Sequence, residues 1–362
     1  MKLFVVAGEN SGDLHGANLM KSLKKQRADI DFRFCGGDRM KKVAQGQILS
    51  IDQMNFMGFV EVLANLGKIK KNFQIVQEAL LDFKPTALIL IDYPGFNLRL
   101  AKFAKANGIK VFYYISPKVW AWKKSRIKKI KAYVDRLFVI LPFEKKFFEQ
   151  HQYEVDYVGN PIMDQIEDYK TRHPDPSNRE KRVLALLPGS RLMEVKRILP
   201  VMLQAATKFK AHQVVVSAVS GLPAEIYDDA RKAGYEIVLD DSYNVLHAAH
   251  IAAVTSGTAT LETALFQVPQ VVCYRANSLS IWLAKKLVKI KFISLVNLIL
   301  DKAAVPELIQ EDCEPQHLSE LLFGLDSGAL REQQLDDYRI LQELVGKSGA
   351  SDKTANLILA HV

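Results

Sequence analysis

Residues 86–116 read TALILIDYPGFNLRLAKFAKANGIKVFYYIS, and their pattern predicts the fold class. An apolar run at 86–92 is followed by a helical pattern at 97–107 and by a second apolar run at 110–116. Two short apolar runs separated by a helix-length segment are typical of parallel strands joined by a crossover helix. The stretch therefore predicts an α/β fold in which helices cover both faces of a parallel sheet.

The same alternation continues on both sides of this stretch. In the first half, further strands are expected at residues 3–8, 32–37, 136–141 and 155–159. The stretch 164–181 is polar and contains Pro174 and Pro176, which is typical of a linker. Beyond it the pattern restarts, with strands expected at residues 183–187, 213–219, 236–239, 251–255 and 270–274.

We therefore expect two doubly wound, Rossmann-like domains that face a cleft, because open α/β folds bind ligands beyond the carboxyl ends of their strands. The expected boundaries are 1–163 for the first domain, 164–181 for the linker and 182–340 for the second domain. Residues 329–362 contain two helical patterns and no strand. We expect the C-terminal part, 341–362, to pack back on the first domain.

Composition narrows the range of partners. The chain has 362 residues and a formal net charge of +9, which favours an anionic partner such as a phosphorylated small molecule, nucleic acid or an acidic membrane surface. Cys35, Cys273 and Cys313 lie far apart, so neither a disulfide framework nor a zinc site is indicated, and a reducing cytoplasm fits. Lysines interrupt the longest apolar region, 281–300, so we expect no membrane-spanning helix.

Two motifs in the first half place carboxylates directly after expected strands. The first, AGENSGD at 7–13, is a glycine-rich turn entering a helix, where backbone can approach a ligand and the helix N-terminus favours anions. A tight turn capped by Ser11 or Asp13 is the alternative, but it leaves Glu9 unexplained. The second, IDYPGFN at 91–97, puts Asp92 at the end of an apolar strand, facing the cleft. A turn or cap role for Asp92 is the alternative.

Two motifs in the second half suit a nucleoside diphosphate. In LPGSR, 187–191, the Arg191 guanidinium beside free backbone N–H groups suits a phosphate oxygen, although an ordinary exposed arginine is the alternative.

In TSGTATLE, 255–262, small residues at a helix start can hold a diphosphate. Glu262, one turn further, can accept hydrogen bonds from a ribose. A capping box explains this spacing poorly, because it needs Glu three residues after the cap. The small residues concerned are Ser256, Gly257 and Thr258.

A basic segment, SPKVWAWKKSRIKKIK at 116–131, contains no acidic residue. Basic residues beside tryptophans suit anionic lipid headgroups or nucleic acid, although a solvated helix face is the commoner cause of such a run. A similar mixture with Trp282 recurs at 281–298, which favours the membrane. The residues expected to face the membrane or the acceptor are Trp120, Trp122, Lys123, Lys124, Lys128 and Lys129.

Taken together, these segments resemble the lipid-A-disaccharide synthase family. The matches follow the family's order and cover nearly the whole chain. Besides the motifs above, they include MGFVEVL at 57–63, LPFE at 141–144, VGNP at 158–161 and SLVNL at 294–298. The family usually has a second acid where Gly95 stands, a serine where Lys118 stands and a histidine where Asn160 stands.

The resemblance implies a glycosyltransferase of the B-type fold, with an acceptor-side, membrane-facing first domain and a UDP-sugar-binding second domain. Such an enzyme joins UDP-2,3-diacylglucosamine to 2,3-diacylglucosamine 1-phosphate with inversion, forming a β-1→6 disaccharide and UDP, with no metal or cofactor expected. The resemblance also implies a peripheral position on the cytoplasmic face of the inner membrane. It makes Asp92 the general base and Glu9 a site glutamate near the acceptor. The implied UDP side comprises Arg191, Ser256, Thr258 and Glu262, with Asn297 as a further site position.

Other functions fit part of the pattern. A transferase of peptidoglycan precursors or a UDP-sugar epimerase would share the 256–262 motif, but not the segments around Asp92 and Trp120. A nucleic-acid-binding protein would leave Glu9, Asp92 and Glu262 without a role, so we expect no nucleic acid partner. The absence of GxGxxG disfavours a nicotinamide oxidoreductase. The sequence leaves the oligomeric state open, a homodimer included.

Overall fold

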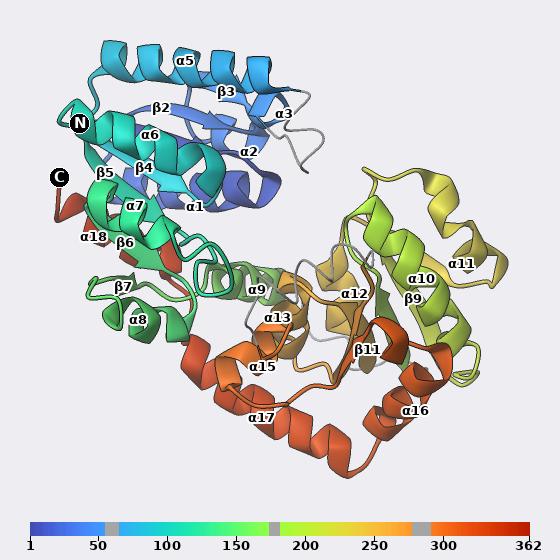
Figure 1. Cartoon of the computed structure of the whole chain (residues 1–362). Coiled ribbons are helices and arrows are strands. Elements are labelled where there is room, and N and C mark those ends of the chain that lie inside the picture. Colours follow the sequence, from blue (N-terminus) through green and yellow to red (C-terminus); the bar gives the residue numbers. More distant parts are fainter. Residues whose placement is uncertain (55–64, 174–181, 277–290) are drawn as a thin grey trace. The chain divides into compact units, whose positions relative to one another are not determined.

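The chain forms two compact units (Figure 1). The computed structural model describes residues 1–54, 65–173, 182–276 and 291–362. Unit 1 consists of Met1–Asp164 with Ser348–Val362, and unit 2 consists of Gln165–Lys347. The MGFVEVL match, the end of the expected linker and the part of the second basic segment that contains Trp282 lie outside the described residues.

Unit 1 is built on a seven-stranded parallel sheet. Its strands are β1 (Lys2–Ala7), β2 (Asp31–Gly36), β3 (Gln47–Ser50), β4 (Ala87–Ile91), β5 (Lys110–Tyr114), β6 (Arg136–Val139) and β7 (Asp156–Tyr157). Its helices are α1 (Asn10–Gln26), α2 (Asp38–Lys41), α3 (Ile51–Met54), α5 (Leu66–Phe83), α6 (Pro94–Ala106), α7 (Arg126–Tyr133), α8 (Pro142–Glu149) and α18 (Ala350–Leu359).

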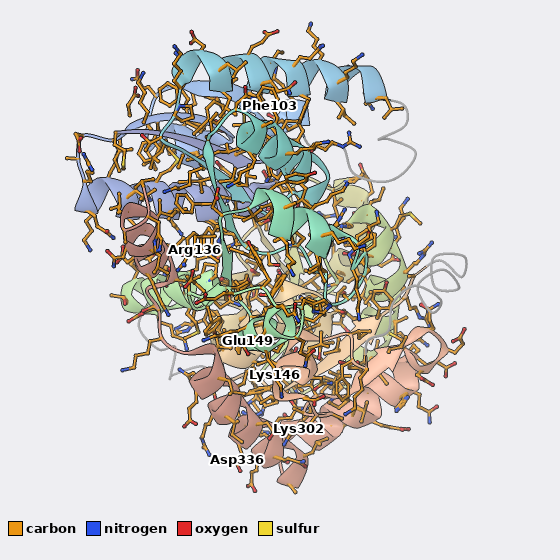
Figure 2. All side chains as sticks on the ribbon, turned by 60° about the vertical axis from the view of Figure 1, so that its left-hand side comes forward. Phe103, Arg136, Lys146, Glu149, Lys302 and Asp336 are labelled. Carbon is orange, nitrogen blue, oxygen red and sulfur yellow. The ribbon has the colours of Figure 1, made fainter. Side chains whose placement is uncertain are left out.

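The sheet of unit 1 is covered on both faces, which explains its continuous apolar strands. Successive residues of β1 point to opposite sides. Leu3 and Val5 pack in one core with residues of α1 and α18, whereas Phe4 and Val6 pack in another with residues of α5 and α6. Figure 2 labels Phe103 of α6, which packs against this second core. Burial on both faces is the pattern expected of a doubly wound fold.

Unit 2 is built on a six-stranded parallel sheet. Its strands are β8 (Val183–Leu187), β9 (Gln213–Ala218), β10 (Glu236–Leu239), β11 (Ile251–Thr255), β12 (Gln270–Tyr274) and β13 (Glu307–Ile309). Its helices are α9 (Pro161–Arg172), which begins in unit 1, α10 (Leu192–Ala206), α11 (Asp228–Lys232), α12 (Ser242–Ala248), α13 (Thr258–Leu265), α15 (Leu295–Leu300), α16 (Pro315–Asp326), α17 (Ala329–Val345) and the 3₁₀ helices η1 (Ala224–Tyr227) and η2 (Gln310–Asp312).

The two sheets share one topology. Their orders are β3-β2-β1-β4-β5-β6-β7 and β10-β9-β8-β11-β12-β13, so each unit follows the doubly wound order 3-2-1-4-5-6. The expectation of two Rossmann-like units with parallel sheets is confirmed. The edge strands β3 and β13 were not expected, because their sequences, QILS and ELI, contain polar residues and give no apolar run. Edge strand β7 is joined to β6 by the ion pair of Arg136 (labelled in Figure 2) with Asp156, at 3.0 Å.

Three boundaries differ from the expected ones. Helix α9 continues to Arg172 through the first part of the expected linker, because Ile166 and Tyr169 bury their apolar side chains. The boundary expected after residue 340 falls inside α17, and the chain returns to unit 1 at Ser348. The sequence pattern of the basic segment also predicts a helix over residues 119–133, but helix α7 begins only at Arg126.

The C-terminal helix α18 is part of unit 1. It packs against α1, and the Gln26 side chain donates to the Asp352 carbonyl at 3.3 Å. The carboxylate of Asp164 accepts hydrogen bonds from the backbone N–H groups at the start of α18, those of Gly349, Ala350 and Ser351. These contacts satisfy amide groups that the first turn of a helix leaves without intrahelical partners.

Candidate active site

In unit 1 the strand order reverses between β1 and β4, which are hydrogen-bonded neighbours with Ala7 opposite Ile91. The chain leaves β1 toward β2 on one side and leaves β4 toward β5 on the other. Loops that diverge in this way leave a crevice at the carboxyl ends of the strands, where ligands of open α/β folds bind. Glu9 and Asp92 lie in these two loops, so the topology brings both predicted carboxylates to the reversal point.

The backbone at Asp92 is held in an unusual conformation. Asp92 and Tyr93 have φ values of +42° and +48°, in the left-handed region that costs a residue other than glycine about 1–3 kcal/mol. Two buried side chains fix this turn: Asn97 Nδ2 and the Tyr113 hydroxyl donate to the Asp92 carbonyl at 2.7 and 2.6 Å. The Asp92 N–H donates to the Tyr114 carbonyl at 3.1 Å. The position of the carboxylate is therefore set by a rigid backbone.

The environment of Asp92 raises the pKa of its carboxyl to about 6. Burial is the larger cause, and the negative charge of Glu9 adds to it. Lys118 and Arg126 act in the opposite direction, so the basic segment contributes charge to this site. A carboxylate with a pKa near 6 is ionised at neutral pH and is a stronger base than an ordinary aspartate, as general base catalysis requires.

Glu9 is the N-cap residue of α1, and its side chain makes no capping hydrogen bond. The adjacent Gly8 lies directly under the ring of Tyr93, where a Cβ atom would be 2.4 Å from a ring carbon. This close approach brings the first turn of α1 against the Asp92 loop. Asp13, by contrast, is buried and accepts hydrogen bonds from the backbone of the β2–α2 turn, so its role is structural.

Glu144 is a buried acid that belongs to the LPFE match but to which no role was assigned from the sequence. It accepts hydrogen bonds from the N–H groups of Leu141 (2.9 Å) and Ile140 (3.2 Å) at the start of α8. Burial nevertheless raises the pKa of its carboxyl to about 7. Trp120 lies beside it and packs edge-on against Phe143 at 5.0 Å between ring centroids. Besides the LPFE match, the signal in the sequence is the position of Glu144 after Pro142 at a helix start, and it indicates capping.

The residues predicted to face the membrane divide into two groups. Trp120 is half-buried against α8, so it contributes to the packing of unit 1. Trp122 is exposed, with Lys123 Nζ 4.4 Å and the Arg126 guanidinium 5.3 Å from its ring centroid. The remaining lysines of the set, Lys124, Lys128 and Lys129, are also exposed. Within the described parts of the chain, no helix is long and apolar enough to cross a membrane.

Unit 2 has its own reversal point between β8 and β11, where Leu187 lies opposite Val254. Arg191 is the N-cap residue of α10 in the loop after β8. Its side chain is 69% exposed and pairs with Glu194 at 3.0 Å, a surface contact worth at most about 1 kcal/mol. A phosphate group can therefore displace this partner at little cost.

The loop after β11 supplies an open helix N-terminus. Gly257 is the N-cap residue of α13 and Thr258 its first residue, and both are exposed. The backbone N–H groups of a first helical turn, together with the helix dipole, favour an anion. The Ser256 hydroxyl donates to the Ile293 carbonyl at 2.9 Å, so it helps to fix the loop.

Glu262 lies one turn into α13 beside Tyr243, whose hydroxyl is 3.3 Å from Glu262 Oε1. Burial raises the pKa of this carboxyl to about 7. Near neutral pH the side chain therefore exists in both protonation states, and it can accept or donate hydrogen bonds. This suits the two hydroxyl groups of a ribose.

The amide of Asn297, which the sequence suggested as a further site position, is engaged within unit 2. Its amide makes four hydrogen bonds within unit 2: Nδ2 donates to Val305 and Glu307, and Oδ1 accepts from Ala304 and Val305, all at 2.8–2.9 Å. The side chain is buried and has no hydrogen-bonding capacity left for a ligand. Asn297 thus supports the loop before β13, and the sequence could not distinguish this from ligand binding.

Comparison with known proteins gives one consistent family. The lipid-A-disaccharide synthetase family profile matches residues 3–358. A lipid-A-disaccharide synthase of Myxococcus xanthus is 37% identical over 99% of this chain and 97% of its own length. One of Coxiella burnetii is 36% identical over 96% of this chain and 92% of its own length.

Solved structures with the same fold are more distant in sequence. A UDP-GlcNAc 2-epimerase of Neisseria meningitidis, bound to UDP-GlcNAc, has a TM-score of 0.65 at 16% identity and full coverage of both chains. The glycosyltransferase of kitacinnamycin has a TM-score of 0.66 at 12% identity, covering 99% of this chain and 98% of its own. At such low identity these likenesses establish the fold alone, which is that of glycosyltransferases and epimerases of the B type.

Proposed function

The chain belongs to the lipid-A-disaccharide synthetase family and is a glycosyltransferase of lipid A biosynthesis, and we propose that it joins UDP-2,3-diacylglucosamine to 2,3-diacylglucosamine 1-phosphate. The 6-hydroxyl oxygen of the acceptor attacks the anomeric carbon of the donor. The bond from that carbon to the diphosphate of UDP breaks as the new bond forms. A single displacement of this kind inverts the anomeric centre and gives a β-1→6 disaccharide and UDP.

Asp92 is the proposed general base. It takes the proton of the 6-hydroxyl while the oxygen attacks, and such assistance contributes about 10²–10⁴-fold to the rate. The raised pKa near 6 and the fixed left-handed backbone support this choice over Glu9. Glu9 is better suited to orient the acceptor, because its side chain is longer and follows a glycine turn.

The leaving diphosphate is stabilised by unit 2 in this proposal. Arg191 supplies a guanidinium, and Gly257 and Thr258 supply the backbone N–H groups of the first turn of α13. Positive groups aimed at the departing oxygens stabilise the charge that develops on them. Ser256 holds the loop, and Glu262 binds the ribose.

The substrates are lipids, so we also propose that the enzyme attaches peripherally to the cytoplasmic face of the inner membrane. The exposed cluster of Trp122 with Lys123, Lys124, Lys128 and Lys129 supports this. Each basic residue near an anionic bilayer contributes about 1 kcal/mol to membrane binding, and salt screens this contribution.

Co-sedimentation measures the affinity of the protein for phosphatidylglycerol vesicles. This affinity should fall about 20-fold in the double variant Lys123→Gln/Lys124→Gln. It should remain unchanged in the control Lys210→Gln/Lys232→Gln. Equal binding of all proteins to phosphatidylcholine at high salt would contradict an electrostatic attachment.

One observation carries the reaction proposal: in a chain of this family, Asp92, whose carboxyl has a raised pKa, follows β4 at the reversal point of the unit 1 sheet. The direct test is incubation of the protein with both lipid substrates, followed by mass spectrometry of the lipid products. We expect a disaccharide 1-phosphate and an equimolar amount of UDP. An epimerised UDP-sugar without a disaccharide would instead support an epimerase.

A further inference from the structure

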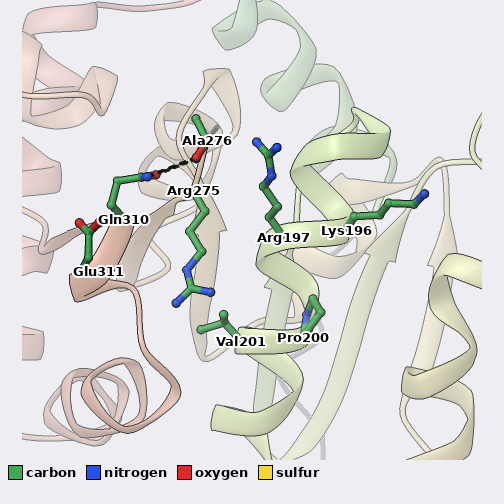
Figure 3. Close-up of a pocket in the computed structure, with 8 residues that line it drawn as sticks. All are labelled: Lys196, Arg197, Pro200, Val201, Arg275, Ala276, Gln310 and Glu311. Atoms are coloured by element: carbon green, nitrogen blue, oxygen red, sulfur yellow. Dashed lines mark hydrogen bonds between the residues drawn. The ribbon is translucent and has the colours of Figure 1, made fainter. Parts of the chain in front are cut away.

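A second pocket in unit 2 has no role in the proposed reaction. Its volume is about 540 Å³, and it is lined by residues of α10, by the segment after β12 and by η2 (Figure 3). None of the residues assigned above to UDP lines it. Arg275 and Gln310 directly follow the carboxyl ends of β12 and β13, which lie at the ligand-binding edge of a parallel sheet. The lining residues are Lys196, Arg197, Pro200, Val201, Arg275, Ala276, Gln310 and Glu311.

The wall that carries Arg275 is fixed by hydrogen bonds. The side-chain amide of Gln310 accepts from the Ala276 N–H at 2.7 Å and donates to the Ala276 carbonyl at 3.2 Å, as drawn in Figure 3. On the other side of Arg275, Tyr274 of β12 pairs with Ile309 of β13. The backbone from which Arg275 extends is thus tied on both sides, to β13 and to the residue that follows it.

The pocket has an excess of positive charge among its lining residues. Arg197 and Arg275 are half-buried and come from α10 and from the segment after β12, and their guanidinium groups point toward opposite ends of the pocket (Figure 3). Among the described residues, no carboxylate lies within ion-pair distance of either guanidinium, whereas the exposed Arg191 nearby in sequence pairs with Glu194. With Lys196 counted, three cations face one acid, Glu311. Half-buried guanidinium groups that lack an anion favour binding one.

We propose that this pocket binds a phosphate ester, and that the half-buried side chains of Arg197 and Arg275 turn toward it from the two ends of the pocket. Arginine forks match the geometry of phosphate oxygens, and Pro200 and Val201 offer an apolar surface for the group that carries the phosphate. The diphosphate of UDP is assigned to α13, so this is a second anion site. The inference rests on the proposed function, because that function brings two phosphate esters to the enzyme. These are the 1-phosphate of the acceptor and the headgroup of an anionic phospholipid.

The test uses the full-length protein with saturating UDP, so that the diphosphate site is already occupied. Glucosamine 1-phosphate is titrated calorimetrically into the wild type, Arg197→Gln, Arg275→Gln and the matched surface control Lys210→Gln. We expect the wild type and the control to bind alike. Each arginine variant should lose about tenfold or more in affinity, because a charge-assisted hydrogen bond is lost. Unchanged affinity for UDP in every variant shows that the fold is intact.

Vesicles distinguish the two sources. One outcome is that glucosamine 1-phosphate does not bind, but both arginine variants bind phosphatidylglycerol vesicles about tenfold less tightly than Lys210→Gln does. This outcome supports the site and identifies its ligand as a lipid headgroup. If neither probe depends on Arg197 or Arg275, the proposal is overturned. Failure of the proposed reaction is seen separately, as the absence of disaccharide product from the wild type.

Discussion

The two sheets share one topology and reverse their strand order at equivalent positions. The loops at the two reversal points nevertheless present groups of opposite charge. In unit 1 the loops after β1 and β4 present the acids Glu9 and Asp92. In unit 2 the loops after β8 and β11 present Arg191 and an open helix N-terminus at Gly257. The comparison teaches that strand order decides where a site forms, whereas the side chains in the two loops decide what the site does.

The two points also differ in how firmly their side chains are held. Asp92 sits on a left-handed turn that two buried donors fix, and its environment changes its pKa. Arg191 is exposed and held only by a surface pair with Glu194. A rigidly held carboxylate and an exposed guanidinium suit different tasks: proton transfer needs accurate geometry, whereas an exposed guanidinium can adjust to a phosphate that arrives and leaves.

The largest expected effect is that of Asp92→Asn, which should lower turnover while UDP binding stays nearly unchanged. Asp92→Asn keeps the size of the side chain but removes the base, so kcat should fall about 10²–10⁴-fold. The affinity for UDP should remain within about twofold of the wild type, because UDP is assigned to unit 2. Steady-state kinetics with saturating lipids and UDP titration measure both quantities. Near-normal turnover would show that Asp92 is not the base and make Glu9 the candidate.

The reciprocal change in unit 2 should give the reverse result. Arg191→Gln removes a charge-assisted contact worth about 1.5–3 kcal/mol, so UDP should bind about 10–100-fold less tightly. Glu194→Gln is the matched control, since it removes the competing partner of Arg191 and should leave UDP affinity equal or higher. If Arg191→Gln binds UDP normally, the assignment of unit 2 to the diphosphate loses its main cation.

The smallest expected effect tests the rigidity of the Asp92 turn. Tyr113→Phe removes one of the two donors to the Asp92 carbonyl and should lower kcat about two- to tenfold, with little change in UDP affinity. Tyr153→Phe is the control, because its hydroxyl donates to the Val134 carbonyl and lies outside the site. An equal loss of kcat in both variants would indicate a general effect on stability.

The sequence predicted the fold well, because buried parallel strands read as apolar runs whatever their neighbours are. It missed the edge strand β13, whose three residues give no such run. The motifs located the loops at both reversal points, since polar residues after apolar strands are visible in the chain. The sequence could not show that the Asn297 side-chain amide forms all its hydrogen bonds within unit 2, or that Trp120 packs against Phe143. These outcomes depend on contacts between segments far apart in the chain.

The pH dependence of kcat/KM tests the central claim most directly, because it reports the pKa of the base in the free enzyme. Asp92 acts in its ionised form, so the account predicts that activity falls as the pH decreases through about 6. Glu9→Gln removes a negative charge that raises this pKa, so the midpoint should move to lower pH while burial keeps it above that of an ordinary aspartate. A profile that is flat from pH 5 to 8, or a midpoint that Glu9→Gln leaves in place, would contradict the account.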